Sequence, residues 1–210
     1  MIRIAIADDR TLIREGLKRI FEAEADLTTA IDAKDGHDLL HQLAVTECDV
    51  VVMDVSMPGP GFFDTLKKIR GRFEDVYVLV LSMHPEEEYA IRALREGARG
   101  YLHKDVDPDT LCEAVRRVAS GGRYVTPRLG ELLVRGLSGD GDAPAHDVLS
   151  DREFEVLRLV GSGLSTDDVG KRLSISPKTV ATYRGRIKEK MGFENIAQIV
   201  RYVVEKSLQD

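Results

Sequence analysis

A short apolar run, Val50–Met53, most constrains the fold of this chain, because it stops abruptly at Asp54. A strand that is apolar throughout is typical of a parallel sheet covered by helices on both faces. Four more strand candidates occur in the first 120 residues, separated by stretches with apolar residues at helical spacing. This alternation predicts an α/β fold with a doubly wound five-stranded parallel sheet. The expected strands are Ile2–Ala7, Leu27–Ile31, Val50–Met53, Val76–Leu81 and Gly100–Leu102, and the expected helices are Leu12–Ala25, Leu39–Val45, Phe62–Arg72, Glu86–Glu96 and Pro108–Ser120.

The composition excludes several classes of protein. Hydrophobic residues make up 43% of the 210 residues and charged residues 31%, which excludes a disordered or collagen-like chain. No apolar run approaches the roughly 18–20 residues of a membrane span, and Asp8-Asp9 interrupts the N-terminus where a signal peptide would need its apolar core. Cys48 and Cys112 lie in apolar-periodic segments and are expected to be buried, reduced thiols. We therefore expect a cytoplasmic protein without membrane contact.

Charge is spread unevenly along the chain. Residues 1–120 carry a formal charge of -7, residues 148–210 carry +2, and the whole chain carries -6. Within residues 176–190, five basic residues accompany one acidic residue, which gives +4. An acidic front half and a short basic segment indicate a regulatory module joined to a nucleic-acid-binding module. On charge alone, a solvated helix face explains the basic segment equally well.

Polar residues follow four of the predicted strands at their carboxyl ends: Asp8-Asp9, Asp54, Ser82 and Lys104. In an open α/β sheet of the flavodoxin-like order 2-1-3-4-5, ligands bind at this edge, between strands 1 and 3. Three neighbouring carboxylates repel one another, and a hard cation such as Mg²⁺ relieves that repulsion. A phosphoryl group would fit between Mg²⁺ and Lys104, with Ser82 as a hydrogen-bond donor. Asp54 is then a candidate nucleophile that forms an aspartyl phosphate.

These residues, together with Met57-Pro58-Gly59 and the run from Gly100 to Asp105, resemble the receiver domain of two-component response regulators. The resemblance covers residues 1–120 and implies that a histidine kinase phosphorylates Asp54. It implies that Asp9, Asp54 and the backbone carbonyl of Ser56 hold Mg²⁺, with Asp8 acting mostly through water. It also implies that Lys104 pairs with the phosphoryl oxygens, and that Ser82 and Tyr101 form a switch in which the serine moves toward the phosphate and the tyrosine ring turns inward.

One position departs from the receiver pattern. Family members commonly carry glycine eight residues after the phospho-acceptor, where this chain has Phe62 and places Gly61 one residue earlier. We therefore expect an unusual path for the loop after Asp54. His84 and His103 flank the predicted pocket and are expected to be polar residues at its rim rather than metal ligands, because no second histidine stands at ligand spacing.

The last third of the chain has only helical patterns. Residues 121–147 are predicted to be a linker with a short helix, Leu129–Leu137, and a flexible Gly/Asp/Pro-rich stretch from Ser138 to Pro144. In residues 148–210, Ser150 and Glu153 form a capping box, and Ser165 and Ser176 are N-cap candidates. Two short helices joined by a tight turn, the second of them basic, indicate a helix-turn-helix. The four expected helices begin at Asp151, Thr166, Pro177 and Glu194.

The segments from Leu149 to Glu153, from Gly163 to Ser165 and from Leu173 to Val180 resemble the LuxR-type DNA-binding domain. A receiver joined to this domain is similar to the NarL/FixJ class of response regulators, which implies promoter DNA as a target, a homodimer as the active form, transcription regulation, and RNA polymerase as a further partner. The DNA-binding candidates are Lys178, Thr179, Thr182, Tyr183, Arg184, Arg186 and Lys190. Gly185 leaves one groove-facing position without a side chain.

Two other functions share part of this pattern. An aspartate nucleophile with Mg²⁺ also describes haloacid-dehalogenase-type phosphatases, but those use a second aspartate two residues later, where this chain has Ser56. A regulator that binds DNA without phosphorylation, under the control of protein partners, is the other alternative. No Gly-rich Walker loop is present, and no nucleophilic serine or cysteine stands with a histidine. The sequence therefore favours a regulator that is not an enzyme.

Overall fold

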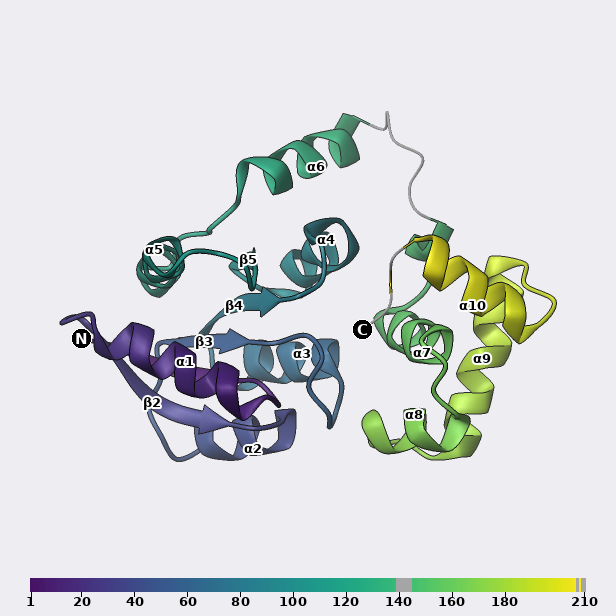
Figure 1. The fold of residues 1–210 in the computed structure, drawn as a ribbon, viewed down its shortest axis with the longest axis horizontal. Coiled ribbons are helices and arrows are strands. Elements are labelled where there is room, and N and C mark those ends of the chain that lie inside the picture. The colour runs from purple at the N-terminus through teal and green to yellow at the C-terminus, as the bar shows by residue number, and fades with distance from the viewer. Residues whose placement is uncertain (139–144, 207, 209–210) are drawn as a thin grey trace. The chain divides into compact units, whose positions relative to one another are not determined.

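The computed structural model describes residues 1–138, 145–206 and 208. It divides into two compact units, Met1–Leu133 and Val134–Asp210, and each is described by itself (Figure 1). The predicted stretch from Ser138 to Pro144 lies, apart from Ser138, outside the described residues. Among the described residues, no helix is long and apolar enough to cross a membrane.

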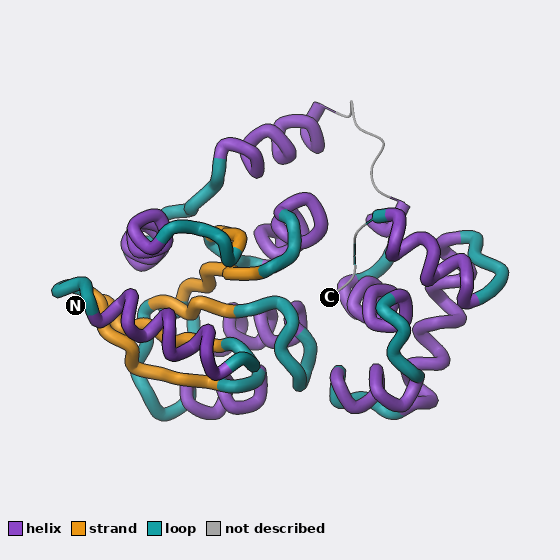
Figure 2. The backbone as a smooth tube through the Cα atoms, in the orientation of Figure 1, coloured by secondary structure: helices purple, strands orange, loops and turns teal. Residues whose placement is uncertain are grey.

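The first unit is built on a parallel sheet of five strands in the order β2-β1-β3-β4-β5 (Figure 2). This arrangement confirms the predicted doubly wound sheet. In the central pairing, Ile4 to Ala7 of β1 lie opposite Val50 to Met53 of β3, so both strands end at the same edge. The strands are β1 (Ile2–Ala7), β2 (Leu27–Ala33), β3 (Val50–Met53), β4 (Tyr77–Ser82) and β5 (Gly100–His103).

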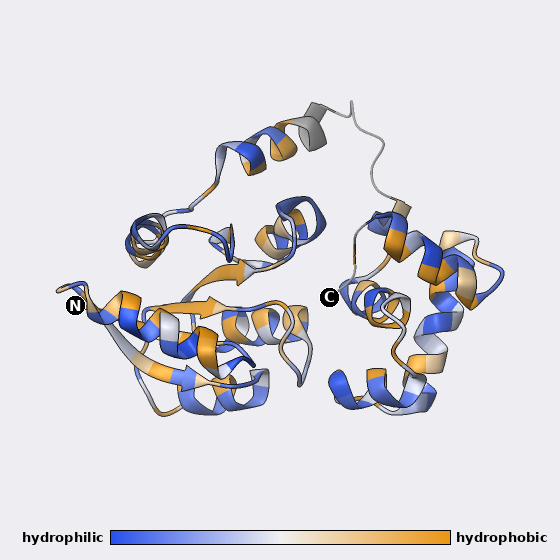
Figure 3. Ribbon diagram, in the orientation of Figure 1, coloured by the Kyte–Doolittle hydropathy of each residue, from blue (hydrophilic) through white to orange (hydrophobic). Residues whose placement is uncertain are grey.

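Helices cover the sheet on both faces. Ile4 and Ile6 of β1 pack in one core cluster with Leu17 and Phe21 of α1 and with Leu111 of α5. Successive strand residues point to opposite faces, so Ala5 and Ala7 face the other layer of helices. Figure 3 shows β3 and β4 as hydrophobic along most of their length, as strands buried on both faces should be. The helices of this unit are α1 (Thr11–Glu22), α2 (Gly36–Leu43), α3 (Phe62–Arg72), α4 (Glu86–Glu96) and α5 (Pro108–Ala119).

Capping explains where these helices begin. The carboxylate of Asp35 accepts hydrogen bonds from the backbone N–H groups of His37 and Asp38, so α2 begins at Gly36, three residues before the expected Leu39. Asp107 caps α5 in the same way, by accepting from the N–H of Thr110, with Pro108 at the first helical position.

The second unit is helical. Ser150 and Glu153 form the predicted capping box at the start of α7, and Ser176 caps α9 by accepting from the N–H of Thr179. The last helix is shorter than expected, because Asn195 caps it and it begins at Ile196. A 3₁₀ turn before α7 was not predicted. The elements are α6 (Pro127–Ser138), which crosses the boundary between the units, η1 (Ala145–Val148), α7 (Asp151–Gly161), α8 (Thr166–Arg172), α9 (Pro177–Met191) and α10 (Ile196–Glu205).

Both cysteines are free and buried, as predicted. The thiol of Cys48 lies 3.2 Å from the carbonyl oxygen of Val50. Burial raises the pKa of Cys48 to about 12 and also raises the pKa of Cys112. Neither thiol is therefore a reactive thiolate at neutral pH.

Candidate functional site

Three carboxylates gather at the carboxyl edge of the sheet. Asp8 and Asp9 follow β1, Asp54 follows β3, and one oxygen of each lies within 4.8 Å of the others. Asp8 and Asp54 are buried, at 2% and 4% exposure, whereas Asp9 is open to solvent. The parallel register of β1 and β3 brings these residues together, since both strands end at one edge.

Lys104 supplies a positive charge to this cluster from the loop after β5. Its Nζ lies 2.5 Å from Oδ2 of Asp8 and 3.1 Å from Oδ1 of Asp54. Burial raises the pKa of Asp54 above its ordinary value, the nearby Lys104 opposes that rise, and the negative charge of Asp8 adds to it. One cation among three carboxylates leaves the site with a net negative charge.

Asp8 is fixed from both sides. Its Oδ1 accepts a hydrogen bond from the backbone N–H of Arg10 at 2.8 Å, and its carbonyl oxygen accepts from the guanidinium of Arg14 at 2.8 Å. Arg14 also pairs with Asp32 at 2.5 Å, which ties α1 to β2 beside the site. Asp8 is therefore held in place before any ligand arrives.

Ser82 and Tyr101 lie on neighbouring strands, and both are fully buried. The hydroxyl of Ser82 accepts a hydrogen bond from the N–H of His84 at 3.1 Å. The Tyr101 hydroxyl donates to the carbonyl of His84 at 2.9 Å, and burial raises its pKa. The ring of Tyr101 therefore occupies the inward position, and both side chains hold the loop after β4.

His84 is not the rim residue that the sequence suggested. It is 5% exposed, and its Nε2 lies 3.0 Å from the hydroxyl of Ser56. Its Nδ1 lies 3.9 Å from the carboxylate of Glu88, and its ring is 5.1 Å from that of Tyr89. His84 thus links the loop after Asp54 to the first turns of α4. His103 is partly exposed and lies 2.8 Å from the carbonyl of Met83.

The loop after Asp54 ends at Gly61, immediately before α3 (Phe62–Arg72). Gly61 has φ +89°, a conformation that favours glycine, and it directly precedes α3. Phe62 then opens the helix with its side chain buried, in edge contact with Phe63 at 4.8 Å and with Tyr89 at 6.2 Å. The phenylalanine that replaces the expected glycine therefore serves as a core residue between α3 and α4.

A contact that the sequence did not suggest joins the start of α6 to α4. The hydroxyl of Thr126 donates to the carboxylate of Glu86, with its oxygens at 2.7 and 2.9 Å, and also caps Leu129 by accepting from its N–H. Arg128 forms an ion pair with Glu87 next to it. Glu86 is the first residue of α4, so the chain leaving the first unit is attached to the helix that follows the Ser82 loop.

In the second unit, α9 presents an exposed polar face. Lys178, Thr182 and Arg186 are exposed at four-residue spacing, and Gly185 lies on the same surface with open space around it. Val180 and Ile187 are fully buried on the opposite side.

Other DNA-binding candidates have partners within the unit. Arg184 donates to the hydroxyl of Thr166 in α8 at 2.8 Å, and Lys190 pairs with the buried carboxylate of Glu153 at 2.7 Å. The hydroxyl of Thr179 lies 2.7 Å from that of Ser176 at the helix start, and the half-buried ring of Tyr183 lies 6.0 Å below the guanidinium of Arg186. These contacts hold α9 on the unit, whereas the side chains of Lys178 and Arg186 are exposed and form no ion pair within the described residues.

Two family models match the chain. The model described as a response regulator receiver domain matches residues 4–116, and the model for bacterial regulatory proteins of the luxR family matches residues 147–203. The chain is 35% identical to the transcriptional regulatory protein DegU of Brevibacillus brevis, over 95% of this chain and 91% of that protein. It is 32% identical to the oxygen regulatory protein NreC of Staphylococcus carnosus over the full length of both.

A solved structure is similar over nearly the whole chain. It is RcsB from Salmonella enterica serovar Typhimurium, bound to the promoter rprA in the presence of the phosphomimetic BeF₃⁻. The TM-score is 0.72, the identity is 25%, and the match covers 97% of this chain and 99% of that one.

Proposed function

The chain belongs to the NarL/FixJ class of response regulators, which are transcription regulators rather than enzymes, and from this membership we propose that phosphorylation of Asp54 by a sensor histidine kinase controls its binding to promoter DNA. Within the proposal, residues 1–120 are the receiver, residues 121–147 the linker and residues 148–210 the DNA-binding domain. The observation that carries it is the placement of Asp54, buried at the carboxyl edge of the sheet, where Lys104 contacts both its carboxylate and that of Asp8.

The carboxylate cluster fits a Mg²⁺ ion. Hard oxygen donors from Asp8, Asp9 and Asp54 are close enough to share one cation, and no histidine or cysteine belongs to the group. We assign these three carboxylates and the carbonyl of Ser56 as the protein ligands. When bound, the ion would neutralise negative charge on the carboxylates and on an incoming phosphoryl group.

Asp54 is the nucleophile in the proposed transfer. A carboxylate oxygen of Asp54 forms a bond to phosphorus, and the bond between phosphorus and the imidazole nitrogen of the kinase phosphohistidine breaks. The electron pair of that bond leaves with the imidazole. Lys104 lies within 3.1 Å of the Asp54 carboxylate, so its ammonium group can pair with a phosphoryl oxygen without large movement.

Ser82 and Tyr101 would pass the change to the loop after β4. In the proposal, the Ser82 hydroxyl turns from the N–H of His84 toward a phosphoryl oxygen. The Tyr101 hydroxyl, bonded to the carbonyl of His84, keeps the loop attached to β5 as it moves. Glu86 lies two residues beyond His84 and accepts a hydrogen bond from Thr126. A movement of the loop would therefore also displace the start of α6.

For DNA binding, we assign α9 to the major groove. Lys178, Thr182 and Arg186 face outward, while Thr179, Tyr183, Arg184 and Lys190 are placed at its ends and flanks or brace it on the unit. RcsB, which resembles this chain over nearly its full length, was solved on promoter DNA. We propose that the active form is a homodimer that binds two half-sites, with RNA polymerase as a further partner.

The decisive experiment is phosphorylation of the full chain with acetyl phosphate and Mg²⁺, followed by DNA binding. Intact-mass measurement should show one added phosphoryl group on the wild type and on Asp105→Asn, a matched control at an exposed aspartate near the site. Asp54→Asn should show none. Equal labelling of Asp54→Asn would place the acceptor elsewhere.

The DNA-binding half of the proposal has its own test. Labelled protein should bind promoter DNA more tightly than unlabelled protein, and the phosphodonor should not change the affinity of Asp54→Asn. A 148–210 fragment should bind DNA at least as well as the unlabelled full chain, if the receiver restrains the DNA-binding domain. Equal affinity of labelled and unlabelled wild-type protein would instead support a regulator controlled by protein partners.

A further inference from the structure

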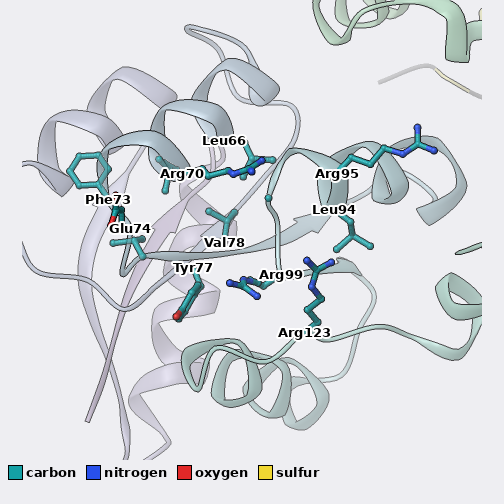
Figure 4. A pocket seen from close by; sticks show the side chains of 13 residues that line it. Leu66, Arg70, Phe73, Glu74, Tyr77, Val78, Leu94, Arg95, Arg99 and Arg123 are labelled. Atoms are coloured by element: carbon teal, nitrogen blue, oxygen red, sulfur yellow. The ribbon is translucent and has the colours of Figure 1, made fainter.

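A second charged site lies at the opposite, amino-terminal edge of the sheet in the first unit. A cavity of about 230 Å³ opens there between the ends of α3 and α4 and the start of β4. Four arginines line it, Arg70, Arg95, Arg99 and Arg123, together with a single carboxylate, that of Glu74 (Figure 4). Nothing in the phosphorylation or DNA-binding proposals uses this cavity.

The arginines come from four separate segments of the chain. Arg70 and Arg95 lie in the last turns of α3 and α4, where a cation is favourable near the negative end of the helix dipole. Arg99 and Arg123 lie outside helices, in the loop before β5 and the loop after α5. The helix dipole therefore accounts for the positions of Arg70 and Arg95, but it does not account for those of Arg99 and Arg123.

These guanidinium groups also lack counter-charges of their own. Within the described part of the chain, none of the four forms an ion pair, although the chain carries a net charge of -6. Like charges gathered around a cavity repel one another unless an anion compensates them. Guanidinium groups bind phosphate oxygens through paired hydrogen bonds, more effectively than an ammonium group does.

Part of the site is positioned in advance. The guanidinium of Arg99 lies 5.0 Å from the centre of the Tyr77 ring and donates to the carbonyl of Gly121 at 3.4 Å. The stem of Arg70 passes over Gly97, where a Cβ would approach Cδ of Arg70 to 2.8 Å. Figure 4 shows Arg99 beside Tyr77 and Arg123 reaching toward Leu94, whereas Arg95 points away along α4. Arg70, Arg99 and Arg123 are therefore the arginines best placed for one ligand.

We propose that this cavity binds a small oligophosphate, either inorganic or carried by a nucleotide, through Arg70, Arg99 and Arg123. The cavity is small and its three charges come from separate segments of the chain, which suits a ligand with several anionic groups close together. Leu66, Val78 and Leu94 also line the cavity, and the base of a nucleotide would pack against this apolar side. The ligand would join α3, α4 and the loop after α5, and so act on the receiver from the edge opposite Asp54.

The test measures binding of tripolyphosphate and of ATP to the full chain by calorimetry, in EDTA and at low salt. EDTA removes Mg²⁺, so the acidic cluster around Asp54 repels the ligand and does not contribute. The key variants are Arg123→Gln, whose side chain has no hydrogen bond or ion pair within the described residues, and the double variant Arg99→Gln/Arg123→Gln. The controls are Arg72→Gln, in the same turn of α3 as Arg70 but outside the cavity, and Arg186→Gln on α9.

We expect binding to the wild type that weakens as salt is added, an affinity about tenfold lower in the double variant, and values within about twofold of the wild type in both controls. Tighter binding of ATP than of tripolyphosphate would identify the nucleotide as the source of the phosphates, and equal binding would identify the phosphate chain alone. Absence of binding to the wild type overturns the proposal. Retained affinity in a folded double variant, or a loss that follows Arg186→Gln instead, also overturns it.

Discussion

The hydroxyl of Tyr101 donates a hydrogen bond to the carbonyl oxygen of His84 at 2.9 Å, and thereby fastens the last strand of the sheet to the loop that follows β4. The hydroxyl of Ser82 accepts a hydrogen bond from the N–H of the same residue. Both backbone polar groups of His84 are therefore bonded to side chains, one from β4 and one from β5. The loop cannot move without altering one of these bonds.

Tyr101→Phe should therefore lower the free energy of unfolding by about 1 kcal/mol, because the variant loses one buried hydrogen bond and keeps the ring. Labelling of Asp54 by acetyl phosphate should continue, whereas the gain in DNA affinity after labelling should shrink. Urea denaturation and a DNA-binding titration measure the two effects. Tyr124→Phe serves as the control, because its hydroxyl forms no hydrogen bond within the described residues.

Asp54 gives a prediction about pH. Burial raises its pKa in the folded state, so the folded protein holds this proton more firmly than the unfolded chain does. The stabilising contribution of protonated Asp54 is present at low pH and is lost as pH rises through the folded pKa. Without Mg²⁺, Asp54→Asn should therefore be more stable than the wild type at neutral and alkaline pH, and the difference should shrink as the pH falls toward the ordinary pKa of an aspartate. A gain that grew toward low pH would contradict this reasoning.

Magnesium should stabilise the folded receiver. A ligand that binds only the native state at ten times its Kd adds about 1.4 kcal/mol, which a thermal scan detects as a higher Tm. Asp9→Asn should lose most of this increase, because it removes the most accessible of the three carboxylates. Asp75→Asn, which changes an exposed carboxylate elsewhere, should respond as the wild type does. Equal shifts in both variants would mean that the ion acts outside the cluster.

Two glycines of the second unit should respond to alanine in opposite directions. A Cβ at Gly161 would collide with the side chain of Val203 where α7 meets α10, so Gly161→Ala should destabilise the protein by about 1–3 kcal/mol. Gly185 is exposed in α9 with open space around it, so Gly185→Ala should stabilise the helix by up to about 1 kcal/mol. Urea denaturation, followed by a signal from the second unit, measures the change in the free energy of unfolding for each variant. A destabilised Gly185→Ala would show that α9 needs this glycine for a reason outside the helix.

The exposed face of α9 predicts how salt will affect DNA binding. If Lys178 neutralises a phosphate, Lys178→Ala should reduce the slope of log affinity against log salt by about one unit. If Arg186 reads a base, Arg186→Ala should cost about 1–3 kcal/mol on cognate DNA and less on scrambled DNA. Glu189→Gln, also exposed on α9, controls for general effects of charge. Unchanged affinities in both alanine variants would exclude α9 as the recognition helix.

Local signals explain which elements could be predicted. The bounds of α3 and α9 coincide with the expected ones, because residues next to the helix ends mark them. Gly61 directly precedes α3, whereas Ser176 directly precedes α9 and Gly192 directly follows it. The clustering of Asp8, Asp54 and Lys104 could also be predicted from the sequence, because the carboxyl ends of parallel strands meet at one edge of the sheet. The resemblance to receivers added the roles of these residues.

Other features depend on partners far along the chain, and no local pattern marks them. The burial of His84 results from Ser56, Glu88 and Tyr89 around it. His146 carries no motif, yet it is buried with its Nδ1 2.8 Å from the hydroxyl of Tyr202. The arginine-lined cavity likewise arises only when four segments meet, so the sequence alone could not identify it.

The deep burial of Cys48 and Cys112 has a practical consequence for spectroscopy. Because both thiols are shielded and hard to deprotonate, maleimide dyes should react with an introduced surface cysteine far faster than with the native pair. Fluorophore pairs could therefore be attached to the natural background, one in each unit, without first replacing the native cysteines. Distances between the units could then be followed in single molecules as phosphodonor, magnesium and DNA are added in turn.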